Sequence, residues 1–248
     1  MEEIKMGTII KLGNHYLARG DARDPELVKK LMGEEKINLV LCDPPYSISL
    51  TTSGFSGNKN TFKPIENDHE QSDEEYRKFT SDWINILKPH LAKKNSMYIF
   101  NCDKKIFALH DGMIDCGCHF AQLLVWAKTH SIIGRLDYLP QNELIAYGWF
   151  GSHKFMRSKD KSILVYPGTR KNTLHPTMKP IGLLRRMILN SCKIGENIFD
   201  PFGGSGSTLI AAEQTGRRCY MIELDESYCN TIISRFEKLT GIKSEIVN

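Results

Sequence analysis

The sequence predicts a doubly wound α/β fold, in which helices cover both faces of a mostly parallel sheet. Short apolar runs alternate with amphipathic segments almost from end to end, which is the pattern of repeated βαβ units. Some of these runs end at an acid and one leads into a glycine-rich turn, as expected where such sheets bind ligands. The chain has 248 residues, 41% apolar and 25% charged, which fits one domain over residues 1–248 with a substantial core.

Apolar runs rich in aliphatic and aromatic residues predict the strands. They cover residues 15–19, 37–42, 96–101, 119–127, 143–149, 196–200 and 218–223. The amphipathic segments between them predict helices at residues 24–33, 72–88, 103–115, 180–193, 205–215 and 225–240. The last helix reads YCNTIISRFEKL and is expected to stop before Gly241, because glycine commonly follows the last turn of a helix.

Two segments interrupt this alternation. Residues 47–68 are rich in Gly, Ser, Thr and Asn and are too long for an ordinary connection, which predicts a mobile functional loop. Residues 151–172 form a small basic insertion that holds only one acid, Asp160. Its basic residues are Lys154, Arg157, Lys159, Lys161, Arg170 and Lys171.

The glycine-rich turn follows the apolar run that ends at Asp200 and reads DPFGGSGST. Such a turn lets backbone N–H groups come close to a ligand, and the helix that follows favours an anion at its start. The turn contains no lysine, which disfavours a nucleoside triphosphate, and Leu209 stands where a dinucleotide fingerprint needs a small residue.

A second acid, Glu223, ends an apolar run about twenty residues after the turn, the spacing of an acid that accepts hydrogen bonds from ribose hydroxyls. Turn and acid together indicate a nucleoside cofactor without a pyrophosphate. The alternative is a tight turn and an unrelated surface glutamate.

Cysteine usage and the first residues bear on the compartment. The seven cysteines have no paired spacing, and the start MEEIKMGTII lacks the basic and apolar parts of a signal peptide, so we expect a reduced, cytoplasmic protein. Cys116, Cys118 and His119 have no second cluster to complete a zinc site, so no metal is expected. No stretch approaches the ~18 apolar residues of a membrane span. A net charge of +4 is compatible with a polyanionic partner but does not identify one.

Three segments together carry a resemblance: CDPPYSI at 42–48, HPTMKPIGLL at 175–184 and FDPFGGSGSTLIAAE at 199–213. They closely resemble the DNA amino-methyltransferases that use S-adenosylmethionine, in the order where the target-base motif precedes the cofactor motif. The similarity extends to ARGDARD at 18–24, LLVWAK at 123–128 and YMIELDESY at 220–228. It implies a seven-stranded Rossmann-like sheet with one antiparallel strand and a circularly permuted order of motifs.

The resemblance also implies which residues hold S-adenosylmethionine. Asp200 and the turn after it match the part that holds the methionine portion, and Glu223 matches the ribose acid. Asp21 matches a position near the cofactor's adenine, while Thr177 and Lys179 lie in a motif that closes over the methionine carboxylate. The expected cofactor-binding residues are Asp21, Ala22, Asp43, Thr177, Lys179, Asp200, Pro201, Phe202, Gly203, Gly204, Ser205, Gly206 and Glu223.

Asp43-Pro44-Pro45-Tyr46 suits methyl transfer to an amine. The exocyclic nitrogen of a base is a poor nucleophile, and acceptors on its two hydrogens stabilise the charge that develops as it attacks. We expect the Asp43 carboxylate and the Pro44 carbonyl to be those acceptors, with both prolines fixing the turn. Tyr46 offers a stacking surface for a base that has left the duplex. Cys42 is expected to point to the opposite face of its strand and not to act as a nucleophile.

The expected polymer is double-stranded DNA. An Asp before Pro-Pro-Tyr resembles the adenine N6 enzymes more than the cytosine N4 enzymes, and the insertion at 151–172 matches the family's target-recognition region. Expected DNA contacts are Lys154, Arg157, Lys159 and Arg170 in the insertion, with Lys59 and Lys63 in the loop at 47–68. A solvated charged hairpin is the alternative for the insertion.

The leading hypothesis is a site-specific DNA adenine N6 methyltransferase of bacterial or phage origin. Three alternatives stay open: methylation of cytosine N4, methylation of RNA or a protein side-chain amide, and a catalytically silent subunit that binds nucleic acid. Pairing with a cognate restriction endonuclease and assembly as a homodimer also stay open.

Overall fold

The computed structural model describes residues 3–46, 71–131, 137–157, 159–168 and 178–247. Within these ranges the strands form one sheet in the order β10-β1-β2-β9-β8-β3-β4-β6-β5-β7. The strands are β1 (Ile9–Leu12), β2 (His15–Arg19), β3 (Ile37–Cys42), β4 (Leu91–Asn101), β5 (His119–Ala127), β6 (Asn142–Trp149), β7 (Ile163–Val165), β8 (Asn197–Asp200), β9 (Arg218–Glu223) and β10 (Glu245–Val247).

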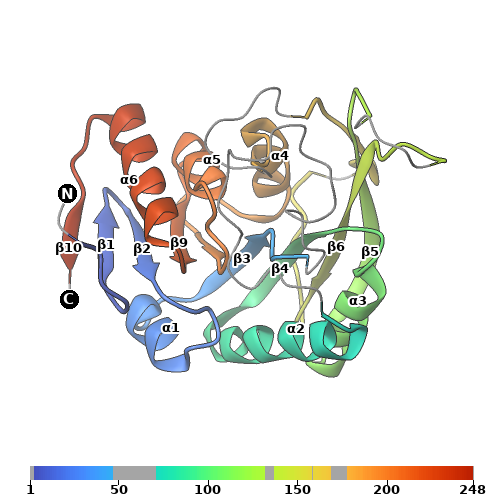
Figure 1. Ribbon diagram of the computed structural model, residues 1–248, viewed down its shortest axis with the longest axis horizontal. Coiled ribbons are helices and arrows are strands. Elements are labelled where there is room, and N and C mark those ends of the chain that lie inside the picture. Colours follow the sequence, from blue (N-terminus) through green and yellow to red (C-terminus); the bar gives the residue numbers. More distant parts are fainter. Residues whose placement is uncertain (1–2, 47–70, 132–136, 158, 169–177, 248) are drawn as a thin grey trace.

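Helices cover both faces of the sheet (Figure 1). One layer holds α1 (Pro25–Met32), α2 (Asp73–Leu87) and α3 (Ile106–Asp115), and a short 3-10 helix, Lys88–His90, follows α2. The other layer holds α4 (Ile181–Ser191), α5 (Ser207–Thr215) and α6 (Glu226–Thr240). Each layer buries an apolar core against its face of the sheet, as the doubly wound prediction requires.

The seven predicted strands form the centre of the sheet. Strands β2, β9, β8, β3 and β4 are parallel neighbours, and β6 runs antiparallel to both β4 and β5. The predicted doubly wound fold with one antiparallel strand is therefore confirmed for these strands.

The prediction missed three short strands at the edges of the sheet. Strand β1 pairs antiparallel with β2 and with β10, and β7 pairs with β5 at the opposite edge. Strands β7 and β10 have three residues each, too few to show the alternation by which a strand is recognised in sequence.

Local capping explains where several helices begin. The Asp24 side chain accepts hydrogen bonds from the backbone N–H groups of Glu26 and Leu27 at the start of α1. Ser72 and Glu75 form a reciprocal capping box at the start of α2. These interactions satisfy N–H groups that have no partner within the helix.

Adjacent strands bring three acids to one edge of the sheet. Asp43 follows β3, Asp200 ends β8 and Glu223 ends β9, and these strands are parallel neighbours. Val40 pairs with Phe199, and Asp200 pairs with Met221. Asp43 and Glu223 therefore both extend two residues beyond the level of Asp200. This edge is where doubly wound sheets bind ligands.

None of the helices in the described ranges has the length and apolar character that crossing a membrane requires.

Candidate active site

A pocket lies at the carboxyl ends of β2, β3, β8 and β9 and collects most of the residues singled out from the sequence. All four expected catalytic residues, Asp43, Pro44, Pro45 and Tyr46, line it. The expected cofactor residues that line it are Asp21, Ala22, Asp43, Lys179, Asp200, Pro201, Phe202, Gly203, Gly204, Ser205 and Glu223. Gly206 lies just behind the turn, with a φ of 79°, and packs against Ile232. Thr177 lies outside the described residues.

Asp200 is a buried carboxylate at the base of the pocket. Its Oδ1 accepts a hydrogen bond from the backbone N–H of Phe202, 3.0 Å away, which holds the start of the glycine turn. Burial raises the pKa of Asp200 to about 8, against the lowering effect of this bond and of Thr208, and the charges of Asp43 and Glu223 add to the rise. No ion pair within the described ranges gives Asp200 a cationic partner.

Glu223 holds the glycine turn from the next strand. The backbone N–H of Gly204 donates to its Oε2 at 2.6 Å, and the backbone N–H of Asp225 donates to its Oε1 at 2.8 Å. Gly204 has a φ of 51°, in the region that favours glycine. Burial raises the pKa of Glu223 to about 7. Each carboxylate oxygen keeps further acceptor capacity toward the pocket.

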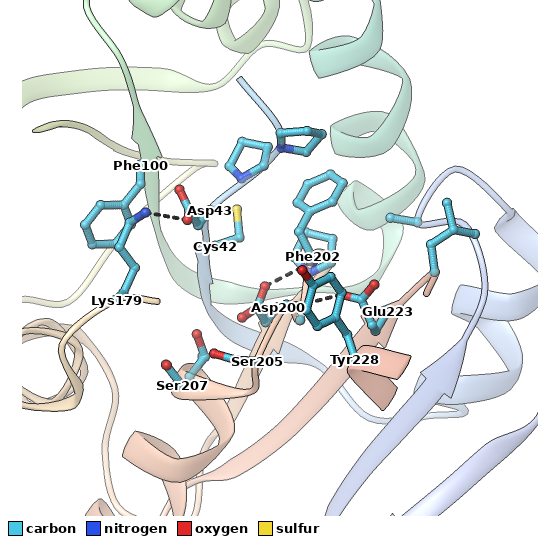
Figure 2. Close-up of a pocket in the computed structure, with 18 of the residues that line it drawn as sticks. Cys42, Asp43, Phe100, Lys179, Asp200, Phe202, Ser205, Ser207, Glu223 and Tyr228 are labelled. Atoms are coloured by element: carbon cyan, nitrogen blue, oxygen red, sulfur yellow. Dashed lines mark hydrogen bonds and ion pairs between the residues drawn. The ribbon is translucent and has the colours of Figure 1, made fainter. Parts of the chain in front are cut away.

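Aromatic rings line the pocket beside Asp200 and Glu223. Phe202 packs against Phe79, with ring centroids 5.8 Å apart, and edge-on against Trp83 at 5.6 Å. Asp21 at the rim pairs with Arg23 at 2.6 Å. Figure 2 shows Phe202, Tyr228 and Glu223 on one side of the pocket and Asp43 with Lys179 on the other. The pocket therefore offers an apolar surface next to hydrogen-bond acceptors.

Two donors from the described part of the chain hold the Asp43 carboxylate. The Tyr46 hydroxyl donates to Oδ1 at 2.5 Å, and the Lys179 ammonium pairs with Oδ2. Burial raises the pKa of Asp43, whereas Lys179 and the Tyr46 hydroxyl act against that rise. Burial and the nearby carboxylates raise the pKa of Tyr46 well above its ordinary value, so its hydroxyl keeps its proton.

Lys179 pairs with two carboxylates of the pocket. Its ammonium lies between Asp43 and Glu143, 3.1 Å from Oε2 of the latter. The contact with a methionine carboxylate that the resemblance implies stays a prediction. Burial works to lower the pKa of Lys179, and the two carboxylates outweigh it, so the pKa is raised and the side chain stays charged.

The sequence reasoning missed Glu143 at the start of β6. Its Oε1 lies 2.7 Å from the Lys128 ammonium. Burial works to raise the pKa of Glu143, but Lys179 and Lys128 lower it below its ordinary value. An acid at the first position of the apolar run 143–149 was the available signal. Phe100, Phe79 and Tyr228 line the pocket as well and were not predicted either, since nothing local distinguishes them from core aromatics.

Cys42 borders the pocket, although we expected it to point away from the site. It is buried, and burial together with the nearby Asp200 and Asp43 carboxylates raises the pKa of its thiol well above the ordinary value. A neutral thiol is a poor nucleophile, so the expectation that Cys42 does not attack the substrate is consistent with its surroundings.

The basic residues expected to contact DNA lie in separate segments of the chain. Lys59, Lys63 and Arg170 lie outside the described residues, and Arg157 and Lys159 are exposed. Lys154 lies beside Lys94 and Lys193, at the amino ends of the parallel strands and so at the edge opposite the pocket. Strand β6 runs antiparallel and so delivers the start of the insertion to that edge, and the DNA contact expected of Lys154 stays a prediction.

The rest of the insertion is tied to α4. Asp160 accepts hydrogen bonds from Arg186 and from Asn190 Nδ2, the latter at 2.7 Å. Tyr166 lies against Gly182, where an added Cβ would meet its hydroxyl oxygen at 1.9 Å. The segment around β7 thus packs on the helix that follows Lys179.

Comparison with known proteins agrees with this site. A family model described as "DNA methylase", for N6 and N4 methyltransferases, matches residues 37–166 and 159–234. The type II methyltransferase M2.DpnII of Streptococcus pneumoniae is 27% identical over 229 residues, covering 83% of this chain and 84% of the relative.

Solved structures share the fold. A complex of M1.HpyAVI with S-adenosylmethionine superposes with a TM-score of 0.65 at 22% identity, covering 88% of this chain and 98% of that one. The cytosine-N4-specific PvuII DNA methyltransferase superposes with a TM-score of 0.70 at 19% identity, covering 93% and 92% of the two chains. With its family model, its permuted motifs and its pocket, the chain belongs to the DNA methylase family of N6 and N4 amino-methyltransferases, which use S-adenosylmethionine.

Proposed function

We propose that this chain transfers a methyl group from S-adenosylmethionine to N6 of adenine at a specific sequence in duplex DNA. The observation that carries the proposal is the position of Asp43. Its carboxylate stands in the same pocket as Asp200 and Glu223, so a methyl donor and a base could meet there. An aspartate, rather than a serine, precedes Pro44-Pro45-Tyr46, and this favours adenine.

The pocket residues fit the cofactor's chemistry. S-adenosylmethionine carries a positive sulfonium and an ammonium group, together with ribose hydroxyls and an adenine ring. Asp200 is buried and Glu223 is partly buried, neither has an ion pair in the described ranges, and positive charge nearby would favour their ionised forms. Glu223 would accept from the ribose hydroxyls, and Phe202 and Phe79 offer surface to the adenine ring.

Asp43 and Pro44 would act on the base. Their oxygens would accept the two amino hydrogens, so that negative charge lies next to the nitrogen as it becomes positive in the transition state. Tyr46 would stack on the flipped base, with its hydroxyl already anchored to Asp43 at 2.5 Å. We further propose that exposed Arg157 and Lys159 contact DNA phosphates.

Cytosine N4 is the second candidate target. It is supported by the fold similarity to the PvuII enzyme, whose described specificity is cytosine N4. The type II relative also leads us to propose a role in restriction-modification, with a cognate endonuclease of the same sequence specificity.

The test uses unmethylated bacteriophage DNA and S-adenosylmethionine carrying a labelled methyl group. After digestion to nucleosides, we expect the label in N6-methyladenine. Label in N4-methylcytosine alone would exclude the adenine assignment. Preferential labelling of RNA or protein over DNA in a competition assay would exclude DNA as the substrate.

A further inference from the structure

Four charged side chains of alternating sign cross the base side of the pocket. In order they are Asp43, Lys179, Glu143 and Lys128, which come from four different segments of the chain. All four are largely buried, with at most 22% of any side chain exposed. Because each interior charge has a neighbour of opposite sign, the row is neutral as a whole, and such a row tolerates burial better than a single charge.

Glu143 contacts two of the groups that surround the catalytic acid. Its Oε2 lies 3.1 Å from the Lys179 ammonium and 3.3 Å from the Tyr46 hydroxyl, as the longer branch of a hydrogen bond whose short branch goes to Asp43. Its other oxygen, Oε1, lies 2.7 Å from Lys128. No step proposed above uses this carboxylate, yet it touches both donors that hold Asp43.

We propose that Glu143 is a positioning residue for methyl transfer, which shares Lys179 and Tyr46 with Asp43 and so leaves Asp43 an oxygen lone pair for the substrate amine. The inference rests on the proposed function. Without the Glu143 carboxylate, Lys179 would have Asp43 as its remaining partner in this row and would compete with the amine for it. Such competition would shift the Asp43 carboxylate from its position at the amine, and a misplacement of about 1 Å at a reacting group can lower the rate about 100-fold.

The charges around Asp43 predict a signature in the pH profile. Asp43 faces Lys179 and Tyr46, and Glu143 lies behind these two side chains. The other titratable groups near Asp43 are Asp200 on the neighbouring strand, Cys42 and Tyr76. The negative charge of Glu143 raises the pKa of Asp43. Removing that charge makes Asp43 easier to ionise, so the acid limb of the pH–rate profile should move to lower pH.

The decisive variant is Glu143→Gln in the full chain, assayed with unmethylated phage DNA and labelled cofactor. We expect kcat to fall about 10- to 100-fold while cofactor affinity measured by calorimetry changes less than about twofold. The acid limb should shift to lower pH, and Glu143→Asp should recover part of the rate. The matched control is Glu35→Gln, since Glu35 pairs with Arg218 at 2.8 Å at the amino ends of the strands, far from the pocket.

An unchanged kcat in Glu143→Gln, or a slower rate with an unmoved acid limb, would overturn the inference. If that variant does not fold, Lys128→Gln keeps the question answerable. Loss of the Lys128 charge leaves Lys179 as the one ammonium beside Glu143 in this row, so Glu143 draws Lys179 more strongly away from Asp43. The acid limb should then move the other way, to higher pH, and a stationary limb would refute the positioning role. Absence of methylation by the unaltered chain would instead reject the proposed function, so the two failures are distinguishable.

Discussion

The Tyr46 hydroxyl lies 2.5 Å from Oδ1 of Asp43, while the Lys179 ammonium pairs with Oδ2 of the same carboxylate. Among the residues that the structure describes, each oxygen thus has one donor and keeps acceptor capacity for another. The plane of the carboxylate is fixed before any substrate arrives. Such preorganisation costs no rearrangement at the moment of reaction, which is where electrostatic catalysis gains most of its effect.

Replacing Asp43 should separate chemistry from cofactor binding. We expect Asp43→Asn to lower kcat by at least about 100-fold, because one acceptor of the amino group loses its charge. The cofactor's dissociation constant should stay within about threefold, as measured by calorimetry. Asp82→Asn, which breaks an exposed pair with Lys78, is the control and should leave both values unchanged. A variant that loses DNA affinity alone would contradict the assignment of Asp43.

Two variants of Tyr46 should separate the contribution of its ring from that of its hydroxyl. Tyr46→Phe removes the hydrogen bonds to Asp43 and Glu143 but keeps the stacking surface. It should slow turnover and preserve base flipping, followed by the fluorescence of 2-aminopurine at the target position. Tyr46→Ala should also weaken the flipped state by about 1–3 kcal/mol, the usual contribution of base–aromatic stacking. Equal flipping in both variants would argue against stacking on Tyr46.

We expect the charge of Asp200 to stabilise the bound cofactor and to lower the free energy of unfolding of the cofactor-free chain. Its pKa is raised to about 8, above the ordinary 3.8, so the folded chain holds the proton to higher pH than the unfolded chain. Stability is then lost as pH rises between those two values. At pH 8, Asp200→Asn should raise the free energy of unfolding by at least about 1 kcal/mol in denaturant titrations. The same variant should bind cofactor more weakly, and a loss of stability would contradict this account.

Cofactor binding should release protons. Asp200 and Glu223, with pKa values raised to about 8 and about 7, are partly protonated in the free chain at neutral pH. A cationic ligand favours their ionised forms, so affinity should increase with pH. Between pH 6 and 7, one such proton changes the dissociation constant by about tenfold. Calorimetry in buffers of different ionisation enthalpy should detect the release, and Asp200→Asn should flatten the pH dependence.

The sequence was informative where a motif is contiguous and ends a strand. Asp43, Asp200 and Glu223 each close an apolar run, and the parallel sheet brings such ends together. The sequence did not predict Glu143, because its place in the site depends on contacts with Lys179 and Lys128, which are distant from it in the sequence. No local pattern records a pairing of that kind.

The insertion shows a different limit of sequence reasoning. Its basic residues form one cluster in the sequence, and we treated them as one surface. The antiparallel direction of β6 places Lys154 at the far edge, while the chain returns along α4 through Asp160 and β7. The edge of the sheet that each part of the insertion reaches depends on strand direction, which is a property of the whole sheet and leaves no local pattern in the sequence.

Strands β9, β8 and β3 lie side by side, and neighbouring strands in a sheet are spaced by about 4.8 Å. The backbones that carry Glu223 and Asp43 are therefore two spacings apart, or ~10 Å across the sheet. The sheet therefore fixes the distance between the ribose end of the proposed donor and the amine that receives the methyl group. Backbone hydrogen bonds between the strands set this distance. Sequence change in the loops and the insertion can therefore alter which DNA is bound while the distance between donor and amine stays constant.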